Sequence, residues 1–523
     1  MGNSGVDALL SEFWAWRTVT QADSPDDLPR VERPDGWVAD WSPDAVAARR
    51  RTLAAFELKR DALDLTGEPI PVRVNGKLLD SALAKVRWEL DQLRNWQRNP
   101  GFYVDQALVP LHEVLLVRQP FEGERAEAVL RHLRRIPETL AHGKENLTGH
   151  AAAPFARSAV QMLDGVRQKL ETAMRALAPH LPSRLASELP DATTQAADAL
   201  ETYRGWLSEP HDFDPETKSG SLEFFLREVA LLPYTPQRLR EMARQEWDRA
   251  VATEKVLKNR HRDLLPPALP ATAAEQVRAQ DRAELEIRRF YEEHDLLSQP
   301  ETLRRYLLTP MPDYLAPLSS LGVTDDLTSA SRVGDDAFRY IPEPRADLPY
   351  FEIAGAVDPR LGICHEGVHA QQLALGWRHP DPARRHFYDS TPNEGIAFYN
   401  EELMLKAGLF DDAPASALII TNFQRLRALR AEIDIALASG ELTIEEAAEQ
   451  IERRVPADRQ TAWEEAVFFA GYPGQGLSYQ VGKLQITELI ADLPAGFGLR
   501  EFHDRLWREG NVPLALQRWE LLG

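Results

Sequence analysis

The stretch "GICHEGVHAQQLALGW", residues 362–377, carries two histidines four positions apart, with a glutamate directly after the first. Side chains four positions apart share one face of an α-helix, so His365 and His369 can offer imidazole nitrogens to one metal ion. Glu366 then projects beside the ion, where a general base is needed. The pattern predicts a helix with two zinc ligands and a base; two packing histidines on an ordinary helix are the alternative.

A catalytic zinc site needs a third protein ligand and an open position for water. The downstream segment "DSTPNEGIAFYNEELMLKAGL" is expected to start a helix at residues 392–393. Glu394 then lies in the first turn and is the predicted third ligand. Glu401 and Glu402 are competing choices. Glu401, on the same face as Glu394, can instead accept a hydrogen bond from a ligand histidine, and Glu402 is expected on a solvated face.

Composition narrows the class of protein. The chain has 523 residues, enough for two or three average domains or one large helical body. Its formal net charge of -20 disfavours nucleic acid and anionic membranes as partners. The single cysteine, Cys364, excludes an intrachain disulfide and is expected to be a small core residue. The first residues lack the basic region of a secretory signal, and no apolar run reaches membrane-spanning length, so we expect a cytoplasmic protein.

The dominant pattern along the chain is helical. Ser42 is a candidate N-cap with Pro43 at the first helical position, and apolar residues then recur at three- and four-residue spacing. Between about residues 309 and 360 the chain becomes rich in Pro, Gly and Asp. There "FRYIP" (338–342) and "YFEIAG" (350–355) are expected as strands of a small sheet beside the active site.

Helices resume after this segment, so the expected fold class is mainly α with a small β element near the active site. We expect a helical N-terminal part over residues 1–332 and a metal-binding catalytic part over residues 333–523.

Three blocks of the C-terminal half carry a family resemblance. They are "HEGVHAQQLAL", "NEGIAFYNEELMLKAGL", and "YPGQGLSYQVGKLQITEL" followed by "REFHDRLWREGNVPL". On these blocks, and more weakly over nearly the whole chain, the sequence resembles the bacterial family of domain of unknown function 885 (DUF885). That family is similar to large helical zinc metallopeptidases such as thimet oligopeptidase and angiotensin-converting enzyme. Many members carry H-E-x-x-P-G-H, whereas this chain has the compact H-E-x-x-H.

The resemblance implies a helical metallopeptidase-like body with a central cleft and one zinc ion per chain, held by His365, His369 and Glu394. Related peptidases supply a second donor to the oxyanion from a late tyrosine or histidine. Tyr479 is the first candidate here, because it lies in the third block, and His503 is another; a buried aromatic packing role is the alternative for Tyr479.

Further residues are candidates for substrate binding. Lys483 lies one helical turn beyond Tyr479 and can bind a substrate carboxylate, as can Arg384 or Arg385; surface charge is the alternative for each. Tyr472, also a candidate oxyanion donor, and Gln475 belong to the Gly/Pro-rich "GYPGQG" turn, where the backbone can approach a substrate.

The leading hypothesis is a zinc-dependent hydrolase that cleaves amide bonds of short peptides with Glu366 as general base. A zinc amidase, or a lyase in which Glu366 removes a carbon-bound proton of a small metabolite, is the first alternative. The second is a non-catalytic helical binding protein with a structural metal, against which the uncoordinated Glu366 argues. The sequence sets neither the substrate nor the oligomeric state, and it leaves room for another divalent ion.

Overall fold

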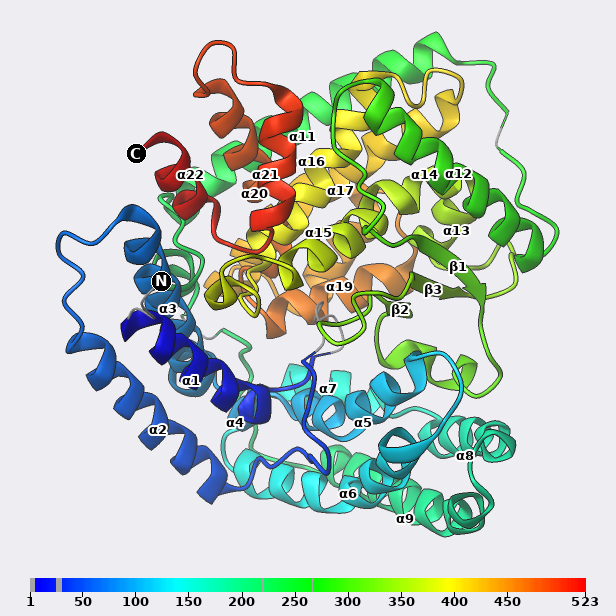
Figure 1. Ribbon diagram of the computed structural model, residues 1–523. Helices are drawn as coiled ribbons and strands as arrows, with labels where there is room; N and C mark the ends of the chain where they lie inside the picture. The colour runs from blue at the N-terminus through cyan, green and yellow to red at the C-terminus, as the bar shows by residue number, and fades with distance from the viewer. Residues whose placement is uncertain (1–4, 25–30, 219–220, 266) are drawn as a thin grey trace.

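The computed structural model describes residues 5–24, 31–218, 221–265 and 267–523. The molecule is mainly α-helical, as predicted, and Figure 1 shows the blue-to-cyan N-terminal helices below the yellow-to-red C-terminal ones. The helical elements before the sheet are α1 (Gly5–Thr20), α2 (Pro43–Asp61), α3 (Ile70–Arg87), η1 (Trp88–Leu93), α4 (Asn95–Arg98), α5 (Pro100–Leu116), α6 (Gly123–Leu147), α7 (Ala153–Met162), α8 (Val166–Leu177), η2 (Ala178–His180), α9 (Ser183–Ser208), α10 (Leu222–Phe224), η3 (Phe225–Val229), α11 (Pro236–Arg260) and α12 (Ala273–Glu293).

The second half of the chain is also helical outside one small sheet. Its helical elements are η4 (Ala316–Leu321), α13 (Tyr350–Val357), α14 (Pro359–Gly362), η5 (Ile363–Gly367), α15 (Val368–Trp377), η6 (Pro382–Arg384), α16 (Ser390–Ala407), α17 (Pro414–Ser439), α18 (Ile444–Arg454), α19 (Arg459–Gly471), α20 (Gln475–Ala491), α21 (Leu499–Glu509) and α22 (Leu514–Leu522).

Local sequence signals explain where several helices begin. Ser42 caps α2 as predicted, since its hydroxyl accepts a hydrogen bond from the backbone N–H of Ala45 at 3.2 Å, and Pro43 is the first helical residue. Residues 1–4, part of the segment tested for a secretory signal, lie outside the described residues, and most of the rest of that segment forms α1. Among the described residues, no helix combines the length and the apolar character needed to cross a bilayer.

The sheet has three strands in the order β1-β3-β2: β1 (Tyr306–Pro310), β2 (Asp325–Asp326) and β3 (Ala337–Ile341). β1 pairs with β3 in parallel, and β2 pairs with β3 antiparallel, so that Asp325 lies opposite Arg339. The prediction of a strand at "FRYIP" is confirmed. The predicted boundary between residues 332 and 333 falls between β2 and β3, so strands from both predicted parts form one sheet.

The segment "YFEIAG" forms the start of α13 and not a strand, so this prediction was wrong. Pro349 precedes the helix, and the carboxylate of Asp458 accepts a hydrogen bond from the backbone N–H of Tyr350 at 2.9 Å. A cap from a distant part of the chain therefore starts this helix. A short apolar segment does not distinguish strand from helix by its own pattern.

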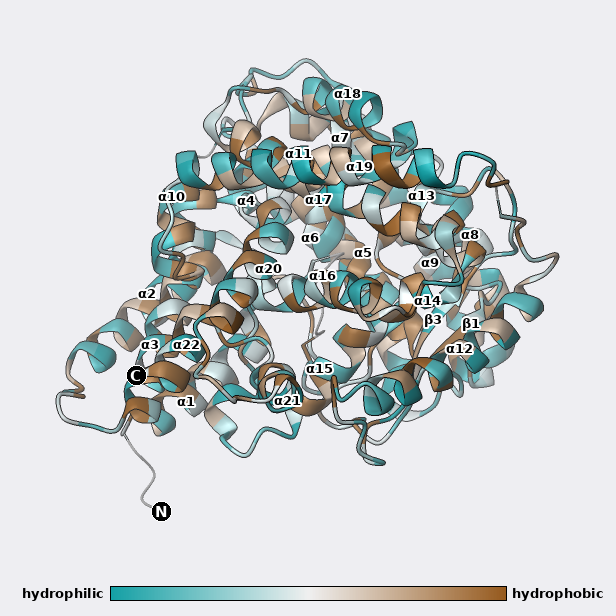
Figure 2. Cartoon of the chain, turned by 90° about the horizontal axis from the view of Figure 1, so that it is seen from above, coloured by the Kyte–Doolittle hydropathy of each residue, from teal (hydrophilic) through white to brown (hydrophobic). Residues whose placement is uncertain are grey.

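Helices α16 and α20 pack closely in the middle of the molecule, where Figure 2 shows them side by side. Glycines make this approach possible. A Cβ atom on Gly395 would lie 2.5 Å from the Cα of Gly482, and one on Gly482 would lie 2.1 Å from the carbonyl oxygen of Thr391. Because both distances are shorter than any real contact, the pair of glycines sets the position of Glu394, next to Gly395, relative to α20.

Candidate metal centre

The predicted histidine helix is present, with one widened turn. It runs through α14, the π-turn η5 and α15 without interruption, and His365 lies in the π-turn. Such π-turns within α-helices occur frequently at functional sites. His365 and His369 are both buried.

Glu394 reaches the two histidines from α16. The helix begins at Ser390, earlier than expected, because Asp389 caps it by accepting a hydrogen bond from the backbone N–H of Thr391 at 2.9 Å. Glu394 therefore lies in the second turn. Its Oε2 atom is 3.4 Å from the Nε2 atoms of both His365 and His369.

The geometry of these three residues fits a divalent metal. One ligand atom from each lies within 4.8 Å of the others. Tetrahedral ligands at the bond lengths of zinc are roughly 3.3 to 3.4 Å apart, which matches the two distances from Glu394. In the described part of the chain, Oε2 of Glu394 and Nδ1 of His369 are buried without a hydrogen-bond partner. One metal ion could thus be held by His365, His369 and Glu394 together.

The electrostatics of the cluster favour a positive charge. Burial raises the pKa of Glu394, but the two histidines outweigh it and hold the pKa well below its usual range. Burial lowers the pKa of His365, yet the carboxylates of Glu394 and Glu401 raise it to about 9. The two carboxylates thus stabilise the positively charged form of the His365 imidazole.

Glu401 lies behind His365, in the orienting position proposed for it. One carboxylate oxygen is 2.8 Å from Nδ1 of His365 and 2.9 Å from the guanidinium of Arg427 on α17. Asn400 donates a hydrogen bond to the carbonyl oxygen of Cys364 at 2.9 Å, which ties α16 to the histidine helix. Cys364 itself is buried in the core. The sequence carried no local signal for Arg427, which is one arginine among many on helices.

A cavity of about 230 Å³ opens beside the cluster. His365, Glu366 and Tyr479 line it, and a quarter of the Glu366 side chain is exposed. The Tyr479 ring lies nearly parallel to the His365 ring, at 13° with the centroids 6.2 Å apart. The guanidinium of Arg430, ion-paired to Glu465, lies 4.7 Å from the centroid of Tyr479. Tyr479 thus forms one wall of the cavity that contains Glu366.

The small sheet contributes a charged group to this cavity that sequence reasoning missed. Arg339 on β3 lies 3.3 Å from Asp325, 2.8 Å from Glu352 and 3.8 Å from Glu366. The hydroxyl of Tyr306 donates a hydrogen bond to Asp325 at 2.7 Å. Burial raises the pKa of Asp325 to about 6, against the attraction of Arg339. The β element therefore lies near the site, and its arginine contacts the carboxylate of Glu366 at long ion-pair distance.

Two predicted residues lie in the interior, away from the cluster. His503 is fully buried, and its ring nitrogens contact the hydroxyl of Tyr399 at 2.9 Å and the carbonyl oxygen of Leu296 at 2.7 Å. Lys483 is buried between Glu246 and Glu402, at 3.1 Å and 2.9 Å. Both side chains already have partners within the protein, and neither of them lines the cavity beside the cluster. Glu402, expected on a solvated face, forms this ion pair instead.

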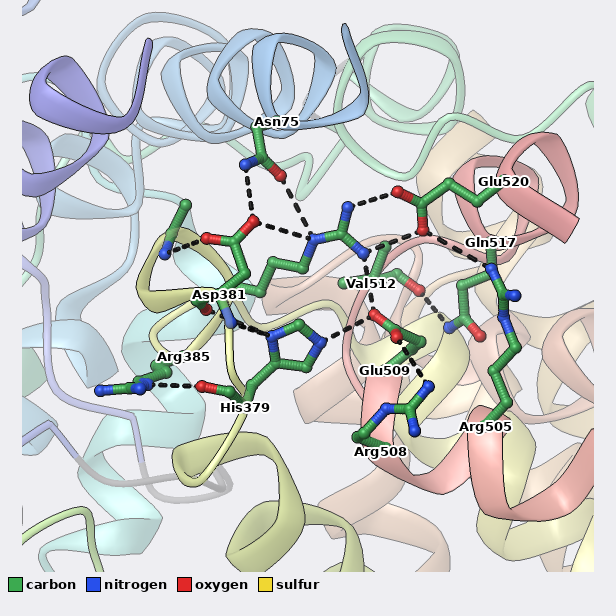
Figure 3. A network of polar contacts seen from close by, with 12 residues as sticks. Asn75, His379, Asp381, Arg385, Arg505, Arg508, Glu509, Val512, Gln517 and Glu520 are labelled. Atoms are coloured by element: carbon green, nitrogen blue, oxygen red, sulfur yellow. Dashed lines mark hydrogen bonds and ion pairs between the residues drawn. The ribbon is translucent and has the colours of Figure 1, made fainter. Parts of the chain in front are cut away.

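Arg384 is also held in a buried network. Figure 3 draws this network around Asn75, Glu509 and Glu520. Arg384 pairs with Glu509 at 2.8 Å and with Glu520, and its Nε donates to Asn75 at 3.2 Å. His379, which is near the motif in sequence, contacts the same Glu509 at 3.0 Å. This network joins α3 to α21 and α22. Arg384 therefore holds these helices together, whereas we predicted that it binds a substrate carboxylate. The remaining predicted residues, Arg385, Tyr472 and Gln475, line a different cavity.

Comparison with known proteins supplies the family. The sequence matches the family described as bacterial protein of unknown function (DUF885) over residues 27–521. The chain belongs to this family. No curated protein matches it.

Two solved structures share the fold of this chain. One is described as a "putative lipoprotein of unknown function" from Shewanella oneidensis; it is 15% identical, with a TM-score of 0.70, over 100% of this chain and 98% of that one. The other is described as a "putative lipoprotein" from Colwellia psychrerythraea; it is 15% identical, with a TM-score of 0.75, over 99% of each chain. These descriptions contradict our prediction of a cytoplasmic protein, which we withdraw.

Proposed function

We propose that this protein is a zinc-dependent hydrolase that cleaves amide bonds of short peptides. The observation that carries the proposal is the convergence of His365, His369 and Glu394 beside a cavity that exposes Glu366. Two histidines and a glutamate are a known ligand set of catalytic zinc, which keeps one position open. A purely structural site is usually closed by four ligands and has no use for a base in an adjoining cavity.

In this proposal His365, His369 and Glu394 hold the ion, and Glu401 orients His365 through Nδ1. When bound, zinc lowers the pKa of a coordinated water towards neutrality and polarises a substrate carbonyl. The carboxylate of Glu366 accepts the proton of the attacking water and passes it to the leaving nitrogen. Arg339, 3.8 Å away, limits the directions in which Glu366 can point.

Tyr479 is the residue we assign to the developing oxyanion. Its ring forms a wall of the cavity next to His365, and Arg430 lies against the ring. A phenol that donates to an oxyanion contributes most when it is held in place before the reaction. The packing of Tyr479 between His365 and Arg430 supports this role.

The size of the cavity limits the substrate. About 230 Å³ is below the usual range for drug-sized ligands, roughly 300 to 1,000 Å³. On this basis we propose a short peptide segment, and not a folded protein, as the substrate. The same volume also suits a small amide or a metabolite from which Glu366 removes a carbon-bound proton, and this is the second candidate.

Glu366→Gln tests the proposal. Wild-type protein should contain about one zinc per chain, and the variant should retain it, while turnover in a library of short peptides and amides falls roughly 10²- to 10⁴-fold. Glu449 is an exposed glutamate on α18. Glu449→Gln is therefore the matched control and should keep full activity. Wild-type protein that takes up no zinc, or equal activity of Glu366→Gln and the control, would refute the proposal.

We also propose that the protein acts outside the cytoplasm, because each of the two structural relatives is described as a "putative lipoprotein". Cell fractionation with antibody detection tests this location. Recovery in the cytoplasmic fraction alone would contradict it.

A further inference from the structure

The cavity beside the metal cluster extends over one face of the small sheet. Leu308 on β1 lies opposite Arg339 on β3, and Ile341 follows two residues later, so the three side chains share that face. All three line the cavity, together with Phe351 and Glu352 from the start of α13. The cavity that contains the general base thus combines apolar walls with charged groups from β3 and α13.

Negative charge exceeds positive charge around Arg339. Its guanidinium lies 2.8 Å from Glu352, 3.3 Å from Asp325 and 3.8 Å from Glu366. In the described part of the chain, no second cationic side chain lies within ion-pair distance of these three carboxylates. One arginine thus faces three carboxylates, and the surroundings favour a further positive charge.

The other two arginines that line the cavity already have carboxylate partners. Arg427 pairs with Glu401 at 2.9 Å, and Arg430 pairs with Glu465. The proposed metal ion would add positive charge at the cluster, where Glu394 opposes part of it. The cavity therefore has no arginine with excess positive charge for a substrate carboxylate, and the excess charge at the sheet is negative.

Glu352 and Gln276 present polar atoms to this cavity. One oxygen of Glu352 contacts Arg339, the other has no partner among the described residues, and the side chain is 21% exposed. Gln276, near the start of α12, is 5% exposed and lines the same cavity. Its amide makes no hydrogen bond to another described residue, and neither of its polar atoms is sealed from solvent. Because buried polar groups are almost always paired, this amide is available to a ligand.

Glu352 is also close to the general base. The guanidinium of Arg339 contacts both Glu352 and Glu366. Two carboxylates on one guanidinium are separated by the length of roughly two residues of extended peptide, at about 3.3 Å each. A peptide whose amino end lies at Glu352 therefore places its first or second amide bond near Glu366.

We infer that Glu352 binds the protonated amino end of the substrate, one or two residues ahead of the bond that is cleaved, and that the amide of Gln276 hydrogen-bonds the adjoining peptide backbone. The first side chain packs on Leu308, Ile341 and Phe351. The substrate class is thus short peptides with a free amino end and an apolar first residue. The peptide character of the substrate rests on the proposed function, whereas the positive charge follows from the charges of the cavity.

Binding of phenylalaninol, an amine with an apolar side chain and no amide bond to cleave, tests the inference. The compound 3-phenylpropan-1-ol is the same molecule without the amine. Isothermal titration calorimetry of the purified protein at neutral pH should show that phenylalaninol binds roughly 10- to 100-fold more tightly, as expected for a charge-assisted contact. Equal affinity for the two ligands would overturn the inference.

Glu352→Gln keeps a hydrogen-bond acceptor for Arg339 but removes the charge. It should weaken binding of phenylalaninol roughly 10- to 100-fold and leave binding of the amine-free alcohol unchanged. Glu441 also pairs with an arginine, Arg240 at 2.6 Å, but lies outside this cavity, so Glu441→Gln is the matched control and should bind like the wild type. No loss in Glu352→Gln, or an equal loss for both ligands, would contradict recognition of the amine.

Steady-state kinetics with phenylalanyl-alanine amide, free or acetylated at its amino end, extends the test to substrates. The wild type should have the higher kcat/KM for the free-amine peptide, and Glu352→Gln should lose this preference. Gln276→Leu removes the amide at similar size and should raise KM for both peptides roughly 3- to 10-fold, as for loss of one hydrogen bond. An unchanged KM would contradict the contact assigned to Gln276.

Binding and turnover together separate this inference from the proposed function. Binding of phenylalaninol that depends on Glu352, in a protein that cleaves no peptide, would support the amine site and refute the hydrolase. Cleavage that depends on Glu366, without any preference for a free amine, would support the hydrolase and refute the amine site.

Discussion

His365 and His503 are both buried histidines with a tyrosine beside them, yet their surroundings are opposite. His365 has carboxylates at both ring nitrogens, with Glu394 at 3.4 Å and Glu401 at 2.8 Å. Its pKa rises to about 9 despite burial. The ring of Tyr479 lies parallel to it at the wall of a cavity.

His503 has no carboxylate at its ring nitrogens among the described residues. Its Nδ1–H donates to the carbonyl oxygen of Leu296, so Nε2 accepts from the hydroxyl of Tyr399. Trp507 packs against the ring, and burial lowers the pKa to about 4.

The difference shows that burial alone does not mark a histidine as functional. Burial among aromatic groups selects the neutral ring and gives it a structural role. Burial between carboxylates creates a place for positive charge, which the proposed metal ion would supply. Substitutions at the two histidine environments should therefore differ in their effects on metal binding, activity and stability.

The largest effect is expected for His369→Ala. Removing one of three ligands should reduce the metal content from about one ion per chain to near zero, because two ligands hold zinc weakly. Elemental analysis of purified protein measures this, with His503→Gln as the comparison that keeps its metal. Zinc retained at full stoichiometry in His369→Ala would show that the cluster is not the metal site.

The tyrosines beside the two histidines should respond differently to loss of their hydroxyl groups. Tyr479→Phe should lower kcat roughly 10²- to 10³-fold, as for removal of an oxyanion donor. Tyr399→Phe should keep kcat and lower the free energy of unfolding by about 1 kcal/mol, the usual worth of a hydrogen bond. Steady-state kinetics and thermal melting of both variants measure this, and equal effects on kcat would contradict it.

His503 should make the protein less stable in acid. Its pKa in the folded state, about 4, is below the value of 6.5 for a free histidine. The neutral His503 ring therefore makes its full contribution to the free energy of unfolding above pH 6.5. This contribution, at most about 3 kcal/mol, is lost as the pH falls towards 4. Urea unfolding at pH 7 and pH 4 measures it. Between pH 7 and pH 4 the wild type should lose up to this amount of stability more than His503→Gln, whose amide can replace both hydrogen bonds. Equal losses in the two proteins would contradict a neutral His503.

The smallest effect is expected for Glu401→Gln. Loss of the charge behind His365 should weaken metal binding roughly 10- to 100-fold, the usual range for groups that orient a ligand. Competition with a chelator measures the affinity. Glu402→Gln is the matched control, because Glu402 is adjacent in sequence but pairs with Lys483 and Lys406, away from the cluster. A similar loss in both variants would point to a general effect on α16.

Sequence patterns predicted the local parts of the site and missed those that depend on long-range packing. The histidine helix and the position of Glu401 follow from helical periodicity. Lys483 and Arg384 were predicted to bind substrate but form buried ion pairs. The residue type alone does not distinguish these two environments. Likewise nothing near "YFEIAG" reveals that Asp458 caps it as a helix.

The mainly helical fold and the spacing of His365, Glu366 and His369 could be predicted from the sequence, because they depend on residues close together in the chain. The groups that surround these three residues come from distant segments, and the folded structure alone reveals them. Arg427 from α17 and Arg339 from β3 reach the site because helix and sheet packing bring them there. Long-range packing also buries His503 among aromatic groups, and so separates two histidines that look alike in the sequence.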